Sequence, residues 1–474
     1  MEVIMKNKIL KIVVLSFTII ILLSTLIYSQ QVKTEYLKGA YRYEKNGWIF
    51  IHLEGEPFQI GYQHGYLLSK EIAQTIQNIK YYLENIVGKP WSYFRNVVEK
   101  IHEVKTPLEY KQEMKGISAA LNDKGYKEFD YLDIVAINNW LQIAWYYIPW
   151  EEQKLEKKSY MFQEKCSAFI ATGNATFDGR IVMAHNSWLD YIVSQYWNII
   201  VDLNPVNGHR TMAQTFPGCI HSGPDWIMND NGIMVTETTM IGFYGFDPDG
   251  IPESVRLRKA TQYANSIDEW INIMLEGNNG EYANDWLIGD RKTGEIARLE
   301  LGLKHYKVWR TFDGYFVGSN IARDKDVRKF ETTFDYSDPS STSYARWARW
   351  QQLMKQYYGT IDTELAKRFL ADHFDTFGEK YRPGSTSICG HIEDDPKGMP
   401  AFGPGPYYPS GAFDAKTMDS INNIRWEFWV KWGHPCGTDF IADKFLKKHP
   451  EYSIQKPQLN DIISKPWTLI APKK

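Results

Sequence analysis

The sequence predicts an α+β fold, and three observations lead to this prediction. Apolar residues recur at helical spacing in the first third of the chain. From Cys166 onward, short apolar runs alternate with turn-forming Asn, Asp and Gly, which is typical of antiparallel hairpins. Helical segments then return between and after these hairpins, so helices are expected to stack on antiparallel sheets.

Composition excludes several classes of protein. The chain has 474 residues, of which 43% are hydrophobic, enough for a large buried core. Its mean hydropathy is −0.42 and its formal net charge is −3. These values exclude a disordered chain and a polytopic membrane protein, and no excess of basic residues indicates a nucleic-acid partner.

Residues 1–29 are predicted to be a signal peptide. Lys6, Lys8 and Lys11 precede an apolar run from Ile12 to Tyr28, which is the order of charged and apolar residues in a secretory signal. We therefore expect an exported protein, either secreted or held in another extracytoplasmic compartment. An uncleaved membrane anchor is the alternative, because the run is near the shortest length that spans a bilayer.

The segment 30–165 is predicted to be mainly helical. Residues 47–53 alternate like a short strand, and residues 57–87 carry apolar side chains at helical spacing after Pro57. Two more helices are expected near 108–122 and 129–147. Residues 151–165 are dominated by charge and lack an apolar face, so they are predicted to form an exposed linker.

The segment 166–474 is predicted to hold the sheets. Turn residues separate apolar runs throughout its first half, and the Asn-Asp-Asn-Gly sequence at 229–232 is the strongest hairpin signal. Four strand pairs follow: 166–171 with 180–185, 197–203 with 211–216, 226–228 with 232–239, and 286–289 with 295–301. Helices are expected near 253–276, 342–358 and 362–372.

Cysteine and histidine spacing predicts no metal site. The four cysteines, Cys166, Cys219, Cys389 and Cys436, form no CxxC pair, and the eleven histidines form no HExxH motif. We therefore expect neither a metal nor a cofactor. Export permits disulfides, and Cys389 with Cys436 is the pair that we expect.

The junction between residues 165 and 166 carries the predicted chemistry. A cut before Cys166 would place a thiol and an α-amino group on one residue. Because their reference pKa values are about 8.5 and about 7.7–8.0, the amine can act as general base for its own thiol. This is the logic of an N-terminal nucleophile, and the competing interpretation is a small buried cysteine that starts a strand.

Several motifs resemble the phospholipase B-like family. The segment from Cys166 to Trp188 resembles its nucleophile hairpin, in which a nucleophilic Cys is followed by a strand that ends in a similar Ala-His-x-x-Trp. Residues 215–225 resemble the family's Tyr-Pro-Gly and Asp-containing stretch. Residues 280–286 are similar to its Tyr-Asn-Asn-Gln segment, and residues 411–416 to its Gly-Gly-Ile-Asp-x-Lys motif.

A second resemblance covers the front of the chain. Residues 55–65 are similar to the opening motif of penicillin-acyltransferase-like, self-cleaving amidohydrolases. Both resemblances imply an Ntn-hydrolase fold, with two antiparallel sheets between helical layers in a four-layer αββα sandwich. They also imply autoproteolysis that frees a cysteine, and two chains of one precursor that remain associated.

The resemblance implies a set of catalytic residues. Cys166 would be the nucleophile in self-cleavage and turnover, and Asn284 would donate to the oxyanion. His185 would orient the thiol or the substrate, and Asp225 would orient the α-amino group. Trp188 and Asn320 would contribute to substrate binding. Each also has a structural interpretation: a core His, turn-forming Asn and Asp residues, and core aromatics.

The predicted function is hydrolysis of an acyl ester or amide bond, most simply deacylation of a lipid at a membrane surface. Aromatic residues on both sides of the linker are candidates to line an acyl pocket: Trp140, Trp145, Tyr146, Tyr147, Trp150, Trp188, Tyr191 and Trp197. The alternatives are an amidase or acyltransferase of the same fold and a secreted glycan-binding module. A papain-like protease is disfavoured because its Cys-Gly-x-Cys-Trp segment is missing.

Overall fold

The computed structural model describes residues 1, 5, 11, 14–18, 34–154, 165–399 and 403–473. Most of the predicted signal peptide therefore lies outside the described residues, and so do all of residues 155–164 of the predicted linker. Within the described ranges, no helix combines the length and the apolar character needed to cross a membrane.

The first segment is mainly helical, as predicted; the helix expected near 108–122 is present, whereas the other two expected helices are divided. The single helix expected over 57–87 is divided at the buried Leu68 and ends in a π-helical turn. The elements of this segment are α2 (Pro57–Leu67), α3 (Ser69–Tyr82), η1 (Leu83–Val87), α4 (Trp91–Val97), η2 (Val98–His102), η3 (Glu103–Lys105), α5 (Leu108–Asp123), α6 (Tyr131–Ile137), α7 (Trp140–Gln142), η4 (Ile143–Tyr147) and α8 (Ile148–Lys154).

A nine-stranded sheet joins strands from both sides of the 165–166 bond. Its order is β1 (Tyr41–Lys45), β2 (Trp48–Gly55), β5 (Ile199–Pro205), β6 (Thr211–Thr215), β7 (Ile227–Asn229), β8 (Ile233–Thr239), β9 (Asn284–Asp290), β10 (Glu295–Leu301) and β11 (Tyr306–Thr311). The three hairpins predicted within it are present. The expectation of two purely antiparallel sheets is wrong, because β2 pairs with β5 in parallel. The connection from β2 to β5 passes through the helices and the other sheet, which is long enough to permit a parallel pair.

The second sheet contains β3 (Lys165–Gly173), the strand that carries the candidate nucleophile Cys166. Its order is β12 (Gly314–Gly318), β3, β4 (Gly179–Asp190), β16 (Asp414–Asp419), β17 (Phe428–Trp432) and β18 (Thr468–Ile470), and β15 (Ser410–Ala412) pairs with β4. The predicted β3–β4 hairpin is present, with Gly173 and Gly179 at positive φ where the chain turns. A third, small sheet pairs β13 (Phe374–Asp375) with β14 (Lys380–Tyr381).

The helices of the second segment follow the predicted positions with one division. The helix expected over 253–276 is two helices, because Ser266 caps a new one with its side chain. The elements are α9 (Tyr191–Ser194), α10 (Glu253–Tyr263), α11 (Ile267–Leu275), α12 (Lys325–Glu331), α13 (Thr342–Gln356), α14 (Thr363–Leu370), η5 (Ile392–Asp394), α15 (Ser420–Arg425), α16 (Ala442–Lys448) and η7 (Pro450–Gln455).

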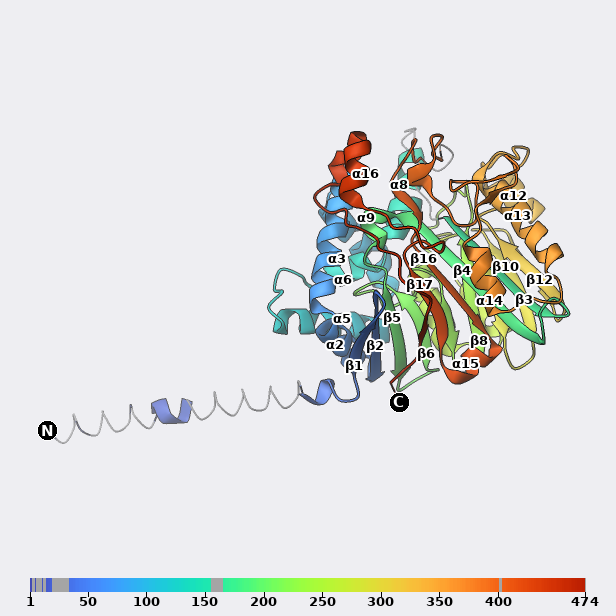
Figure 1. Cartoon of the computed structure of the whole chain (residues 1–474). Helices are drawn as coiled ribbons and strands as arrows, with labels where there is room; N and C mark the ends of the chain where they lie inside the picture. The colour runs from blue at the N-terminus through green and yellow to red at the C-terminus, as the bar shows by residue number, and fades with distance from the viewer. Residues whose placement is uncertain are drawn as a thin grey trace.

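The two large sheets pack against each other, and the alternation of side chains along β4 shows how. Ile181 and Met183 belong to the core that contains the nine-stranded sheet, whereas Val182 and Ala184 pack in a separate cluster with α13 and α14. On β9, Trp286 contacts Trp270 of α11, while Gly289 faces Ile181 across the sheet interface. Figure 1 shows the helices of the first segment at one side of the strands and α12 and α13 at the other. The fold is therefore a mixed α+β arrangement with its core between and around two sheets.

Candidate active site

Cys166 is the second residue of β3, and side chains from two other elements hold its backbone. Its N–H donates to Oδ1 of Asn320 at 3.0 Å, and its carbonyl oxygen accepts from Nη1 of Arg346 at 2.5 Å. Arg346, on α13, also donates from Nη2 to the same Oδ1 at 2.9 Å. Cys166 is 1% exposed, and Asn320 and Arg346 are fully buried. The peptide bond before Cys166 is thus anchored at its nitrogen.

Asn320 reaches this position because β12 ends early. Gly318, the last residue of β12, pairs with Ala168, and the chain then turns so that Asn320 lies beside Cys166. A Cβ at Gly318 would lie 2.6 Å from Oγ1 of Thr238, so only glycine permits this approach of β12 to β8. The Nδ2 group of Asn320 donates to the carbonyl of Thr239 at 2.7 Å, which ties the amide to the end of β8.

Arg346 is a buried cation whose hydrogen bonds go to neutral acceptors. It donates to the Cys166 carbonyl, the Ser167 and Thr342 hydroxyls and the Asn320 amide. Burial lowers the pKa of Arg346 to about 9. Its guanidinium carbon lies 4.5 Å from the centroid of the Trp188 ring, a cation–π arrangement. A positive charge is thereby held next to the candidate nucleophile.

The thiol lies between the two large sheets with two titratable neighbours. Sγ of Cys166, a ring nitrogen of His185 and a carboxylate oxygen of Glu237 all lie within 4.8 Å of one another. His185 is on β4 opposite Ala168, and Glu237 is on β8 of the other sheet. Burial, together with the charge of Lys416, holds the pKa of His185 well below its usual range. The imidazole is therefore neutral at neutral pH, and its affinity for a proton is low.

Lys416 is paired with His185 in the β4–β16 register and is itself fully buried. Its ammonium group donates to both carboxylate oxygens of Asp414 at 2.9 and 3.0 Å and to the hydroxyl of Ser187 at 2.6 Å. A thiol, an imidazole and a carboxylate match the ligand types and number of a catalytic zinc site. The neighbouring lysine charge disfavours a cation there, so this arrangement favours proton transfer over metal binding.

Asp225 joins the site through Tyr282. The Tyr282 hydroxyl donates to Oδ2 of Asp225 at 2.8 Å and lies 3.5 Å from Oε1 of Glu237. The two sequence motifs at 215–225 and 280–286 are therefore brought together. Asp225 was predicted to orient the α-amino group of Cys166, and this role stays a prediction.

Asn284 is the first residue of β9, opposite Thr239, whose carbonyl accepts from Asn320. The Asn284 side chain is fully buried, and neither its Nδ2 nor its Oδ1 has a hydrogen-bond partner among the described residues. A buried amide normally finds partners, so an unpaired one near a candidate nucleophile is suited to a substrate oxygen.

Trp188 is fully buried, and its indole N–H donates to Oδ1 of Asn186 at 3.2 Å. The ring packs between Arg346 and Gly390, where a Cβ on Gly390 would lie 2.2 Å from a ring carbon. Its predicted contact with substrate stays a prediction.

Two important residues were not predicted from the sequence. Arg346 gave only a weak signal, because it is an arginine on a partly apolar helix face with no acidic residue one turn away. Glu237 gave a stronger signal of function, since it is the charged residue in a strand that is buried over its whole length.

His64, in the motif at residues 55–65, accepts from the Gly218 N–H at 3.1 Å and packs in the core.

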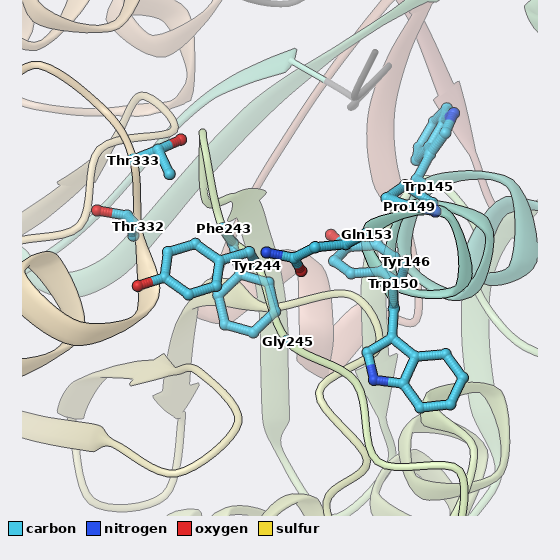
Figure 2. A pocket seen from close by; sticks show the side chains of 10 residues that line it. All are labelled: Trp145, Tyr146, Pro149, Trp150, Gln153, Phe243, Tyr244, Gly245, Thr332 and Thr333. Atoms are coloured by element: carbon cyan, nitrogen blue, oxygen red, sulfur yellow. The ribbon is translucent and has the colours of Figure 1, made fainter. Parts of the chain in front are cut away.

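A cavity of about 480 Å³ lies between the helical first segment and the loop after β8 (Figure 2). Its lining residues come from the helices before the linker, from the loop after β8 and from the end of α12: Trp145, Tyr146, Pro149, Trp150, Gln153, Phe243, Tyr244, Gly245, Thr332 and Thr333. The loop after β8 also contacts Asn320, because the Ile241 N–H donates to the Asn320 carbonyl at 3.0 Å, although Ile241 itself does not line this cavity. Three of the predicted pocket aromatics, Trp145, Tyr146 and Trp150, thus line a cavity.

Residues 43–298 match the family model described as Phospholipase B. The matched range covers more than half of the chain and includes Cys166, His185, Asp225 and Asn284, but not Asn320, Arg346 or Lys416. The chain belongs to the phospholipase B family.

Relatives agree with this assignment. An uncharacterized protein of Archaeoglobus fulgidus is 27% identical over 69% of this chain and 58% of its own length. Phospholipase B of Crotalus adamanteus is 24% identical over 50% of this chain and 46% of its own. Phospholipase B-like protein C of Dictyostelium discoideum is 27% identical over 40% and 38%, respectively. The alignments thus span about half the length of these relatives.

Proposed function

We propose that this chain is an exported, self-processing hydrolase that removes acyl groups from lipid esters, with Cys166 as an N-terminal nucleophile. The observation that carries the proposal is the set of contacts around Cys166. Asn320 and Arg346 hydrogen-bond to its N–H and carbonyl, and its thiol lies within 4.8 Å of His185 and Glu237. A cysteine buried only for packing needs no such hydrogen bonds from side chains. The proposal includes the four-layer αββα sandwich of Ntn hydrolases, which the packing of helices on both sheets supports.

Self-processing begins with attack of the Cys166 thiolate on the carbonyl carbon of Lys165. The C–N bond breaks, the nitrogen leaves as an amine, and the acyl group remains on sulfur as a thioester. Water then hydrolyses this thioester, which frees the thiol and leaves a carboxylate on Lys165. His185 is the candidate base for this first step, because no free α-amine exists before the cut and a ring nitrogen of His185 lies within 4.8 Å of Sγ of Cys166.

Turnover repeats the chemistry on a substrate ester. The α-amine of Cys166 takes the thiol proton, the thiolate attacks the ester carbonyl, and Asn284 donates to the oxyanion. The ammonium then protonates the leaving alcohol, and water releases the fatty acid from the thioester. Arg346 lies beside the amine position and lowers the pKa of that amine, which keeps it neutral and basic.

The cavity in Figure 2 supports an apolar acyl group. Trp145, Tyr146 and Phe243 line it, and Ile241, two residues before Phe243 in the chain, donates its N–H to the carbonyl of Asn320. Aromatic rings bury acyl chains without requiring hydrogen bonds. In the uncleaved chain Cys166 is 1% exposed, so turnover requires that cutting the 165–166 bond opens a path to the thiol. The substrate would be presented at a lipid surface.

The first prediction tests processing and turnover together. Wild-type protein is expected to yield two chains, with Cys166 as the new N-terminus, and to release fatty acid from phospholipid vesicles. Cys166→Ala abolishes both, because sulfur is the attacking atom in each, and Cys166→Ser slows or stops cleavage. The measurements are intact mass, N-terminal sequencing and titration of released acid.

Cys219→Ala provides the matched control, because Cys219 is also a buried thiol but donates to the carbonyl of His221 outside the site. It should leave processing unchanged. A Cys166→Ala protein that is cut at the same bond at the normal rate would falsify self-processing. Processed protein that cleaves N-acyl amides but no phospholipid would favour the amidase alternative. An uncut, inactive wild-type protein would favour the glycan-binding alternative.

A further inference from the structure

Four potential metal ligands gather in a second cluster that lies apart from Cys166. Their donor atoms, a ring nitrogen each from His373 and His391 and Sγ from Cys389 and Cys436, all lie within 4.8 Å of one another. Cys389 and His391 are fully or almost fully buried. The ligands come from three loops: one after α14, one before η5 and one after β17. This distribution explains why sequence spacing predicts no metal site.

The distances in the cluster fit the edges of a tetrahedron. Nε2 of His391 lies 3.5 Å from Sγ of Cys389 and 3.5 Å from Sγ of Cys436. Zinc is bound at about 2.3 Å by sulfur and about 2.0–2.1 Å by nitrogen, so the tetrahedral S···N edge is about 3.5 Å. Both cysteines are thiols in the structure, so the expected Cys389–Cys436 disulfide is not formed.

The surroundings orient His391 as a ligand. Its Nδ1 lies 3.0 Å from Oε1 of Glu393, which leaves Nε2 directed at the two sulfurs. Glu393 also accepts from the Tyr191 hydroxyl at 2.7 Å and lies 3.3 Å from Nε2 of His434. A carboxylate that fixes the second nitrogen of a ligand histidine is the usual support of a zinc site.

We propose that His373, Cys389, His391 and Cys436 form a structural Cys₂His₂ site for a divalent metal ion, with Zn²⁺ the best match. Thiolate and imidazole are the ligands that zinc prefers, and four protein ligands close the coordination sphere, as in structural sites. Binding releases the two thiol protons to solvent, so the charge of the ion is balanced by two thiolates. His373, Cys389, His391 and Cys436 are hereafter called the four-ligand cluster.

The four-ligand cluster joins loops that pack on the candidate active site. The Cys389 N–H donates to the carbonyl of Asp372, and the neighbouring Ile388 carbonyl accepts from Nδ2 of Asn186 at 2.9 Å. Gly390, between two ligands, packs on Trp188. A bound metal would therefore stabilise the loop that covers Trp188 and the end of β4, without contacting substrate.

The test uses the full wild-type protein and measures bound metal. Protein purified from zinc-containing medium is expected to contain about one zinc per chain by elemental analysis. A chelator should remove the metal and lower Tm. Added Co²⁺ should then produce the intense thiolate-to-cobalt absorption band of a tetrahedral thiolate site. These readouts are independent of Cys166 chemistry, so their failure is distinguishable from failure of the proposed function.

Variants localise the site. Cys436→Ser, at the more exposed ligand, should abolish the cobalt band, whereas the control Cys219→Ala should retain it. Glu393→Gln keeps all four ligands and should weaken metal binding about 10- to 100-fold, as loss of such a supporting carboxylate does. Wild-type protein that binds no zinc or cobalt after reduction would overturn the proposal, and a Cys389–Cys436 disulfide in the purified protein would identify a covalent link instead. An unchanged cobalt band in Cys436→Ser would also overturn it.

Discussion

Three residues around Cys166 have backbone conformations that are unfavourable for residues with a Cβ atom. The φ angles are +49° at Asp225, +53° at Tyr282 and +69° at Asn320. Asn and Asp tolerate this left-handed region best, whereas it costs more for a bulky residue such as Tyr282. All three residues use their side chains in the site: Tyr282 donates to Asp225, and Asn320 accepts from the Cys166 N–H. Unfavourable backbone conformations at several residues of one site are typical of functional sites.

Asn284 offers a residue-scale prediction that separates catalysis from stability. Asn284→Ala should lower kcat by about 10²-fold or more, because one oxyanion donor is lost. Thermal stability should change little, since the amide has no hydrogen bond to lose within the described part of the chain. Steady-state kinetics and a thermal melt provide the two measurements.

Asn78 on α3 supplies the matched control. It is also fully buried with both amide atoms unpaired in the described ranges, but it belongs to a helix of the first segment. Asn78→Ala should leave kcat unchanged. If Asn284→Ala retains activity within a few-fold of wild type, backbone amides must stabilise the oxyanion.

The site residues that could be predicted from the sequence lie in local motifs, whereas those that could not are defined by contacts between distant parts of the chain. Cys166, His185 and Asn284 lie in local motifs, so their neighbours in the chain indicate them. Arg346 and the four-ligand cluster are defined by contacts between distant segments, such as the hydrogen bond that joins Arg346 to Cys166 across 180 positions. No local pattern carries that information.

At the scale of elements, hairpins were predicted better than helix lengths. A hairpin is fixed by its own turn, as at Asn229–Gly232, where strand ends and turn residues are adjacent in sequence. The helix expected over 57–87 is instead divided at Leu68, where φ is −119° and ψ is 22°. Its first part, α2, is in backbone contact with α5, since a Cβ at Gly61 would lie 1.7 Å from the carbonyl oxygen of Glu113. Helical periodicity alone does not reveal such a contact.

Glu253, at the start of α10, predicts a dependence of stability on pH. Burial raises the pKa of its carboxyl group to about 7, against the opposing charge of Arg256. Because the folded pKa lies above the unfolded value of 4.5, Glu253 contributes most stability below pH 4.5. This contribution is lost as pH rises toward 7. The loss is ~3 kcal/mol at about 1.4 kcal/mol per pKa unit.

Glu253→Gln removes this titration while keeping an oxygen that can accept from Gln142. Relative to the parent protein, the variant should gain up to ~3 kcal/mol of unfolding free energy between pH 4.5 and pH 8. Urea unfolding in an uncleaved Cys166→Ala background measures the difference. Glu276→Gln, at an exposed ion pair with Lys259, should show no comparable trend. An equal pH profile for Glu253→Gln and its parent would show that Glu253 ionises normally.

The whole molecule depends on strands from both segments. β2 pairs with the whole of β5, from Ile49 opposite Ile199 to Gly55 opposite Pro205. Tyr43 and Asn46 also hydrogen-bond to Ala471 and Thr468 near the end of the chain. The segments 30–165 and 166–474 therefore share one sheet and one core, in line with the prediction that the two would stay associated.

Shared packing predicts that processing does not separate the two chains. Cleaved wild-type protein should elute from a sizing column under native conditions at the volume of uncleaved Cys166→Ala protein. It should separate into two bands only after denaturation, because β2 and the helices of the first segment cannot leave without exposing apolar core. Elution of two separate species under native conditions would contradict the shared core.

The parallel β2–β5 pair also determines what happens to the protein after its bond is cut. Before cleavage, the two strands meet by closing a loop within one chain, at an entropic cost that grows slowly with loop length. Afterward, the same pairing requires an encounter between two molecules at whatever dilution the environment imposes. If the chain is processed as proposed, the two parts of a copy that unfolds would separate by diffusion, and the lifetime of the processed protein would be set by how slowly it unfolds.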